Sequence, residues 1–150
     1  MLLRCGRAAR VPARRPGRLH CGMRIVAHGV DIVVCSRIER IWKEHGPRFL
    51  DRIYTPRERD YCLAARDATP RLAGRFATKE AVMKALGVGW RAGIEWTDIE
   101  TLPDGYGKPH VALAGQTALR AREIGIDEML ISISHAGDYA VASAIGVAGA

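Results

Sequence analysis

The chain has 150 residues, a length that suits one domain with a single hydrophobic core. Hydrophobic residues make up 48% of it, as in ordinary globular proteins, and no run approaches the roughly 18 apolar residues of a membrane-spanning helix. These features argue against an integral membrane protein, so we expect a soluble one.

Residues 1–22 differ in charge from the rest of the chain. They contain six of the 23 basic residues and no acid, so without them the net charge of +7 becomes 17 basic against 16 acidic residues, or +1, over residues 23–150. This basic leader could be a nucleic-acid-binding arm, or an arginine-rich transit peptide, although it has no serine. We favour a third interpretation, a disordered tail or an upstream start, with Met23 as the first residue of the working domain.

The first half of the domain begins with a strand and continues with helices. Residues 24–34 are rich in β-branched side chains, which predicts a strand. Ser36, with Glu39 three residues later, predicts a capped helix that runs to about residue 45 and ends at Gly46-Pro47. Thr55, followed by a proline and an acid in the first turn, predicts a further helix to about residue 66.

The second half mixes helices with short strands. A long helix begins at Pro70 and ends near Leu86, where Gly87-Val88-Gly89 stops it. The patterns that follow predict strands at 94–102, 110–113, 129–134 and 139–147, and a helix at 116–124. The last two strands form a hairpin, joined by residues 135–138. This order predicts an α+β fold with a mainly antiparallel sheet.

Asp31 is a polar residue in an apolar strand. A lone buried carboxylate is unfavourable unless a cation or hydrogen-bond donors accompany it. The sequence therefore predicts either a cation partner for Asp31 or a position at the end of the strand, where the carboxylate would cap the next helix.

Glu80 and Lys84 interrupt the apolar stripe of the long helix, four residues apart. They could form a surface pair, although that interpretation suits Lys79 better, because Lys79 lies off the stripe. Carboxylates from a strand and a helix could instead bind Mg²⁺, which proteins usually hold through one or two carboxylates plus substrate phosphates. Lys84 could then bind a phosphate oxygen, or act as a base if burial lowers its pKa.

Two weaker features lie nearer the C-terminus. Ser132 and Ser134 share one face of a predicted strand, and His135 follows at the tip of the hairpin. The glycine-rich segments 87–89 and 105–109 allow the backbone to approach a phosphate or a nucleotide ring. Ordinary turn chemistry is an alternative explanation for each of them.

These segments, in this order, resemble the holo-[acyl-carrier-protein] synthase family of 4'-phosphopantetheinyl transferases. The resemblance covers about Met23 to Val147, and its most specific part is Arg-Phe-Ala-Thr-Lys-Glu-Ala-Val-Met-Lys-Ala at residues 75–85. The other matching segments are Gly29-Val30-Asp31-Ile32, Arg37-Ile38-Glu39-Arg40, Gly107-Lys108-Pro109, Ser132-Ile133-Ser134-His135 and Tyr139-Ala140-Val141-Ala142.

The resemblance implies a 4'-phosphopantetheinyl transferase fold and a reaction. The 4'-phosphopantetheine group of coenzyme A would pass to a serine of an acyl carrier protein, with release of 3',5'-ADP. Asp31 and Glu80 would bind Mg²⁺, and the serine proton would go to Glu80 through water or to Lys84. Seven residues would contact coenzyme A: Arg75, Gly87, Gly89, Lys108, Pro109, Ser134 and His135.

The family also implies a cytoplasmic homotrimer with active sites between subunits. Carrier proteins are acidic, so we expect one to dock on the basic stripe formed by Arg37, Arg40 and Lys43 at spacings of three. An ordinary solvated helix face is the alternative, because Glu39 and Glu44 flank the stripe.

Two other classes of function compete with this one. A basic nucleic-acid-binding module would depend on the leader and the glycine loops, but two phenylalanines and four tyrosines are few for base stacking. A structural oligomer would pair Glu80 with Lys84 across an interface. We therefore expect no nucleic-acid and no membrane partner.

None of the four cysteines has metal-site spacing, so we expect reduced thiols in a cytosolic protein at Cys5, Cys21, Cys35 and Cys62.

Overall fold

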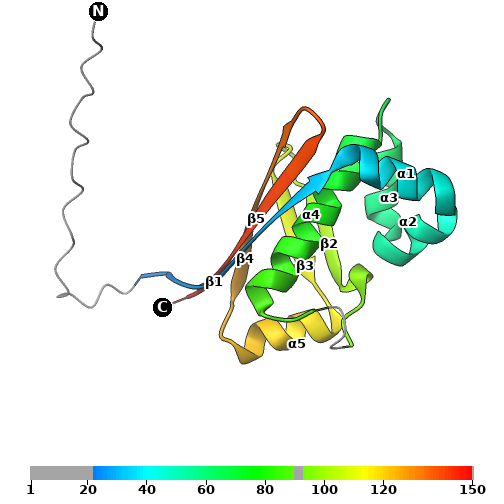
Figure 1. The fold of residues 1–150 in the computed structure, drawn as a ribbon. Coiled ribbons are helices and arrows are strands. Elements are labelled where there is room, and N and C mark those ends of the chain that lie inside the picture. The colour runs from blue at the N-terminus through cyan, green and yellow to red at the C-terminus, as the bar shows by residue number, and fades with distance from the viewer. Residues whose placement is uncertain (1–21, 90–92, 150) are drawn as a thin grey trace, which may run out of the picture.

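The central element of the fold is a three-stranded antiparallel sheet. In the computed structural model, which describes residues 22–89 and 93–149, its strands are β1 (Arg24–Val34), β5 (Tyr139–Ala148) and β4 (Glu128–Ala136), in the order β1-β5-β4 (Figure 1). The last strand of the chain is thus the middle strand, and its Ala140, Ala142 and Ala144 are fully buried on the face that the long helix covers. The predicted α+β class is confirmed.

Helix α4 (Thr69–Leu86) lies across one face of this sheet (Figure 1). The helix approaches β1 very closely at Gly29, where an added Cβ would lie 2.0 Å from the carbonyl oxygen of Ala81. At its other end, Gly74 lies against the side chains of Ile133 and His135 on β4. The small residues of the helix therefore bring it down onto the sheet along a diagonal.

A second, two-stranded sheet covers another side of α4. It consists of β2 (Ile99–Pro103) and β3 (Pro109–Leu113), preceded by the 3-10 helix η1 (Trp96–Asp98) and followed by helix α5 (Gly115–Glu123). The strand predicted at 94–102 is therefore shorter and begins later. Because the helix contacts β2 as well as β1 and β5, twelve of its 18 residues are buried, more than a single apolar stripe would give.

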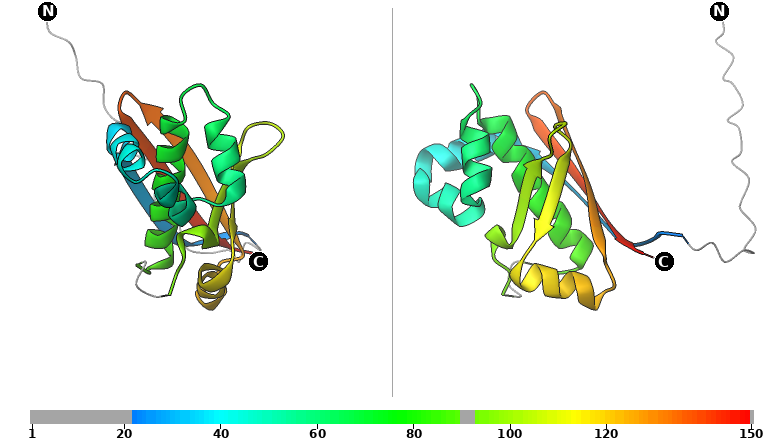
Figure 2. Two further views of the ribbon diagram at one scale, coloured as in Figure 1. Left: turned by 90° about the vertical axis from the view of Figure 1, so that its right-hand side faces the viewer. Right: turned by 180° about the vertical axis from the view of Figure 1, so that it is seen from behind.

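Three short helices gather at the start of α4, at the opposite end from α5 (Figure 2). They are α1 (Cys35–His45), α2 (Pro47–Ile53) and α3 (Pro56–Leu63). The predicted cap of α3 is confirmed, because Thr55 and Glu58 form a capping box. Helix α2 was not predicted: Pro47 begins a new helix instead of only ending the previous one.

The predicted cap of α1 is wrong. The helix begins at Cys35, and Ser36 does not cap it with its own side chain. Instead Asp138, in the turn between β4 and β5, accepts hydrogen bonds from the Ser36 backbone at 2.9 Å and from its hydroxyl at 2.5 Å, and the Asp138 carbonyl accepts one from the Cys35 backbone. Asp138 of the hairpin thus accepts hydrogen bonds from backbone N–H groups in the first turn of α1 that have no partner within the helix.

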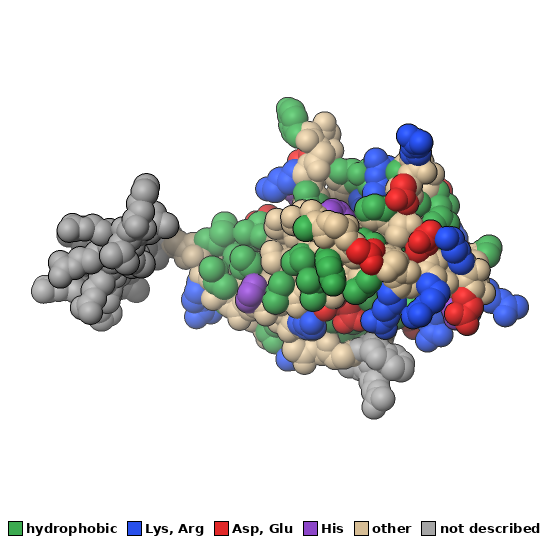
Figure 3. All heavy atoms as spheres, turned by 45° about the horizontal axis from the view of Figure 1, so that its top comes forward, with side chains coloured by type: hydrophobic (Ala, Val, Ile, Leu, Met, Phe, Trp, Pro, Cys, Tyr) green, Lys and Arg blue, Asp and Glu red, His purple; other side chains and the backbone are tan. Residues whose placement is uncertain are grey.

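The face of the large sheet that points away from α4 is apolar and exposed. Its register places Val30, Ile32, Ser132, Ser134 and Tyr139 on this outer face. Ile32 keeps 63% and Val30 50% of its surface accessible to solvent. Figure 3 shows hydrophobic side chains gathered on the surface of the molecule.

No helix among the described residues has the length and apolar character needed to cross a bilayer.

Cys35 and Cys62 are free and buried, and burial raises the pKa of the Cys62 thiol to about 11, so it is inert near neutral pH. Cys5, Cys21 and nearly all of the predicted leader lie outside the described residues.

Candidate active site

Asp31 and Lys84 meet where the last turns of α4 cross β1. The Lys84 ammonium donates to Asp31 Oδ1 at 2.8 Å and to the carbonyl oxygen of Val30 at 3.1 Å. The Asp31 side chain is 16% exposed and that of Lys84 is 53% exposed, so the pair lies at the edge of the core and opens to solvent. Asp31 is therefore not a cap of α1: its carboxylate has a cation partner from the helix.

The hydrogen bond to Asp31 raises the pKa of Lys84 above its ordinary value. The sequence allowed Lys84 to act as a base if burial lowered this pKa, and the structure gives the opposite direction. Lys84 is therefore a fixed positive charge in this arrangement, suited to bind an anionic oxygen rather than to accept a proton.

Glu80 lies one turn before Lys84 on α4 and is half-buried. Burial, followed by the negative charge of Asp31, raises the pKa of the Glu80 carboxyl, while the charges of Lys84 and Arg37 act in the opposite direction. The two carboxylates therefore lie close enough to repel each other. Two acids of this kind, from a strand and a helix, with a lysine beside them, form a place where a divalent cation would be stabilised.

The donor set fits Mg²⁺ bound together with a substrate. Within residues 22–89 and 93–149, no group of three or more His, Cys, Asp or Glu side chains surrounds one point. Asp31 and Glu80 would supply two oxygens, and Mg²⁺ characteristically completes its octahedral shell with water and phosphate oxygens. This composition differs from that of an all-protein cage for zinc or calcium.

His135 lies apart from this cluster within the chain. It is part of β4, paired with Ala140, rather than at the hairpin tip, and its ring lies against Gly74 with Nε2 2.8 Å from the carbonyl oxygen of Pro70. Gly74 precedes Lys84 by ten residues, or about 15 Å along the helix. Ser134 faces the opposite side of the sheet.

Arg75 also points away from Glu80. It is only 6% exposed, its Nε and Nη1 donate to the carbonyl oxygens of Thr101 and Arg71, and its guanidinium lies 4.2 Å from the centre of the Tyr61 ring. The chain therefore does not bring together all of the predicted site. Asp31, Glu80 and Lys84 form one group, and Arg75 and His135 lie near the first half of α4.

The predicted loop residues lie at two turns. Gly87 has φ 66°, the left-handed conformation that ends α4, and both Gly87 and Gly89 are exposed. Lys108 and Pro109 follow the turn between β2 and β3, where Asp104 Oδ1 accepts from the backbone of Lys108 at 2.9 Å.

The basic stripe on α1 is exposed in the structure, as both a docking surface and an ordinary solvated helix face would be. Arg37, Arg40 and Lys43 are all exposed, and Ile38 is buried on the other side of the helix. Lys43 pairs with Glu39 at 2.6 Å. Because Arg37 affects the pKa of Glu80, the stripe begins beside the carboxylate group.

The prediction for Lys79 is wrong. Its side chain is fully buried and forms an ion pair of 2.8 Å with the equally buried Glu58. A one-stripe view of α4 missed this pair because the helix is covered on more than one side. In the sequence, Glu58 stands out only as the acid of the Thr55 capping box at the start of α3. That pattern does not indicate a buried partner on α4.

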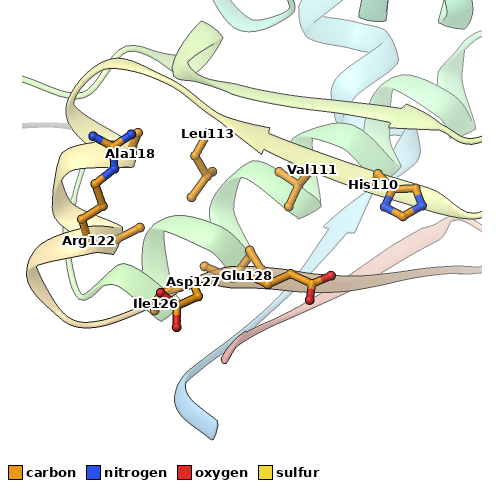
Figure 4. A pocket seen from close by; sticks show the side chains of 10 residues that line it. His110, Val111, Leu113, Ala118, Arg122, Ile126, Asp127 and Glu128 are labelled. Atoms are coloured by element: carbon orange, nitrogen blue, oxygen red, sulfur yellow. The ribbon is translucent and has the colours of Figure 1, made fainter. Parts of the chain in front are cut away.

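One cavity lies away from these residues. It has a volume of about 410 Å³ and lies between β3, α5 and the start of β4 (Figure 4). Its walls include His110, Val111, Arg122 and Glu128 and none of the predicted site residues. Asp31, Glu80 and Lys84 therefore do not line this cavity.

Comparison with known proteins identifies the family. A family model of the 4'-phosphopantetheinyl transferase superfamily matches residues 27–144. The chain is 46% identical over 121 residues to a holo-[acyl-carrier-protein] synthase of Caldanaerobacter subterraneus, covering 81% of this chain and 94% of that one. It is 44% identical over 126 residues to one of Chlamydia pneumoniae, covering 84% and 100%.

Solved structures agree. The holo-[acyl-carrier-protein] synthase of Neisseria meningitidis superimposes with a TM-score of 0.74 at 35% identity, covering 82% of this chain and 98% of that one. A Bacillus anthracis holo-(acyl-carrier-protein) synthase in complex with CoA (3',5'-ADP) gives 0.70 at 32% identity, covering 85% and 100%. The expected fold and enzyme class are therefore confirmed, and this chain belongs to the 4'-phosphopantetheinyl transferase superfamily.

Proposed function

We propose that this chain is a holo-[acyl-carrier-protein] synthase that transfers the 4'-phosphopantetheine group of coenzyme A to a serine of an acyl carrier protein. The observation that carries the proposal is the group of Asp31, Glu80 and Lys84 on a chain of this family. In the reaction, the serine oxygen forms a bond to the β-phosphorus of coenzyme A, and the bond to 3',5'-ADP breaks.

Asp31 and Glu80 would hold Mg²⁺ at this point. Bound there, the ion would neutralise charge on the pyrophosphate of coenzyme A and on the departing nucleotide. The protonated Lys84 would contact a phosphate oxygen. The serine proton would pass to Glu80 acting through water, since a protonated Lys84 has no lone pair to accept it.

The remaining residues would contact coenzyme A from a neighbouring copy of the chain. His135 and Arg75 lie nearer the first half of α4, roughly 15 Å along the helix from Lys84, so they would complete the site of another subunit. The exposed apolar face around Val30 and Ile32 would supply part of the contact between copies. We therefore propose a homotrimer with shared sites. The coenzyme A contacts would be Arg75, Gly87, Gly89, Lys108, Pro109, Ser134 and His135.

The carrier protein would dock on α1. Arg37, Arg40 and Lys43 form an exposed basic stripe whose first member lies beside Glu80, so an acidic carrier bound there would have its serine near the metal. The reaction would take place in the cytoplasm, and residues 23–150 would suffice for it without the basic leader.

The test is the mass of an apo acyl carrier protein incubated with this chain, coenzyme A and Mg²⁺. We expect the carrier to gain one phosphopantetheine group, and Asp31→Ala or Glu80→Gln to slow this gain at least about 100-fold. Glu123→Gln, on an exposed carboxylate of α5, is the matched control and should act normally. No gain with the unaltered chain, or normal rates with Glu80→Gln at saturating Mg²⁺, would contradict the proposal.

Subunit sharing has a separate test. Inactive Glu80→Ala and inactive His135→Ala chains, unfolded and refolded together, should recover part of the activity, because some sites then combine a normal Glu80 with a normal His135. Mixed oligomers without any recovery would place the whole site within one chain.

A further inference from the structure

A buried polar network lies on the side of α4 that faces away from the site. Lys79 and Glu58 are both fully buried, and the ammonium lies 2.8 Å from Glu58 Oε2. The same ammonium donates to the carbonyl oxygen of Trp96 at 2.9 Å and to that of Ile99. All three of its N–H groups therefore have acceptors.

The carboxylate of Glu58 is equally well satisfied. Its Oε2 accepts from the Thr55 backbone and its Oε1 from the Thr101 backbone, each at 2.9 Å. The network thus joins four elements: α3 carries Glu58, α4 carries Lys79, and η1, β2 and the start of α3 supply backbone partners.

Such a pair is a poor source of stability compared with apolar side chains of the same size, because both charges lose their water. Its distinctive property is direction: an ammonium with three acceptors and a carboxylate with three donors fit in one arrangement only. Apart from the Lys84 hydrogen bonds to β1, the contacts of α4 with the large sheet lack this property, because they are made by small residues: Gly74, Ala77, Ala81 and Ala85. Apolar contacts of this kind are not directional.

Lys79 directly precedes Glu80, and successive residues of a helix are rotated by about 100°. Fixing the direction of Lys79 therefore fixes that of Glu80, and of Lys84 one turn later. We propose that Lys79 and Glu58 are positioning residues, which set the rotation and height of α4 so that Glu80 and Lys84 face Asp31. The catalytic consequence rests on the proposed function, whereas the positioning itself does not.

Two variants test this assignment. Glu58→Gln with Lys79→Met removes both charges, and Glu58→Asp keeps the charge but shortens the carboxylate arm. Leu50→Ala is the control, because Leu50 is a buried residue of α2 outside the network, and its loss lowers stability without touching the network. All proteins are measured at a temperature at which circular dichroism shows them folded.

The position of α4 is measured first by nuclear Overhauser effects. An α-proton of Gly29 points at the backbone nitrogen of Ala85, which lies 2.6 Å from where a Cβ would stand. We expect this cross-peak to weaken at least about twofold in both network variants and to keep its intensity in Leu50→Ala. Mn²⁺ alone, titrated by calorimetry, should bind about 10-fold more weakly to the network variants, and kcat should fall about 10- to 100-fold.

The results separate the two proposals. An unchanged Gly29–Ala85 cross-peak with unchanged Mn²⁺ affinity in a folded network variant would overturn the positioning role and leave a role in stability only. If the unaltered chain transfers no phosphopantetheine, but the cross-peak weakens in the network variants alone, the positioning role stands and the proposed function fails. If the double variant does not fold, the same measurements on Glu58→Asp decide the positioning role.

Discussion

Replacing Gly29 by alanine perturbs the site without altering any charged residue. The added Cβ would stand 2.0 Å from the carbonyl oxygen of Ala81 and 2.6 Å from the backbone nitrogen of Ala85. Both are backbone atoms of α4, so no side-chain rotation relieves the contact. The substitution therefore pushes the helix off the strand that carries Asp31.

The structure sets the size of the effect. Ordinary contact begins at 3.4 Å, so the helix must move by the difference between 3.4 and 2.0 Å, or 1.4 Å, along this contact. Overpacking of a core typically destabilises by about 1–3 kcal/mol, and we expect the upper end here, with an unfolding midpoint roughly 10 °C lower. A displacement of about 1 Å between reacting groups can slow a reaction about 100-fold, so turnover should fall by at least that factor.

Thermal unfolding and the release of 3',5'-ADP in the presence of a carrier protein measure the two effects. Gly105→Ala is the control for stability, because an added Cβ meets nothing within 4 Å there and the residue does not have a positive φ. It should unfold at the same temperature as the unaltered chain. If Gly29→Ala matched Gly105→Ala in stability and the unaltered chain in turnover, the close approach of α4 to β1 would not exist as described.

Three further predictions follow from individual contacts. Asp138→Ala removes the acceptor from the first turn of α1 and should lower the free energy of unfolding in urea by about 1 kcal/mol, whereas an unchanged value would contradict the capping role. Changing Arg37 and Arg40 to Glu should raise KM for the carrier protein and leave KM for coenzyme A unchanged; equal rises would refute docking on α1. Glu80→Gln should stabilise the metal-free chain at neutral pH. The raised carboxyl pKa of Glu80 contributes stability below its ordinary value of 4.5, and this stability is lost as pH rises through the folded-state pKa, whereas a neutral glutamine does not titrate. Thermal midpoints between about pH 4 and 8 should therefore diverge with rising pH, and a constant difference would show that the Glu80 pKa is not raised.

Local patterns predicted most of the fold. The β-branched residues of β1, the apolar run of β5 and the capping box at Thr55 are features of neighbouring residues in the chain, so they can be found without a structure. The cap of α1 could not be found in this way, because its acceptor, Asp138, is 102 residues away from Ser36. Proline at position 47 has two meanings, an end or a beginning, and the sequence alone favoured the wrong one.

The site was partly predictable for a similar reason. A spacing of four on one helix implies that Glu80 and Lys84 point the same way. The sequence allowed either a cation partner or a capping position for Asp31, and it did not single out Lys84 as the partner. The burial of Lys79 depends on β2 and η1 packing against the far side of α4, which periodicity within the helix does not reveal. Under the proposed function, the position of His135 relative to Asp31 would depend on contacts between chains, which the pattern of one chain does not give.

The central position of β5 in the sheet has a consequence for folding of the chain during its synthesis on the ribosome. β1 and β4 pair with β5 and not with each other, so neither has a sheet partner until residues 139–148 have been made. At about 5–20 residues per second, β1 waits roughly 5–20 s for that partner after Val34 is added. During this time the apolar strand is available to other nascent chains or to chaperones. Low temperature or slow codons late in the message would lengthen the exposure, so the yield of folded protein in a cell should depend on how quickly the final strand is translated.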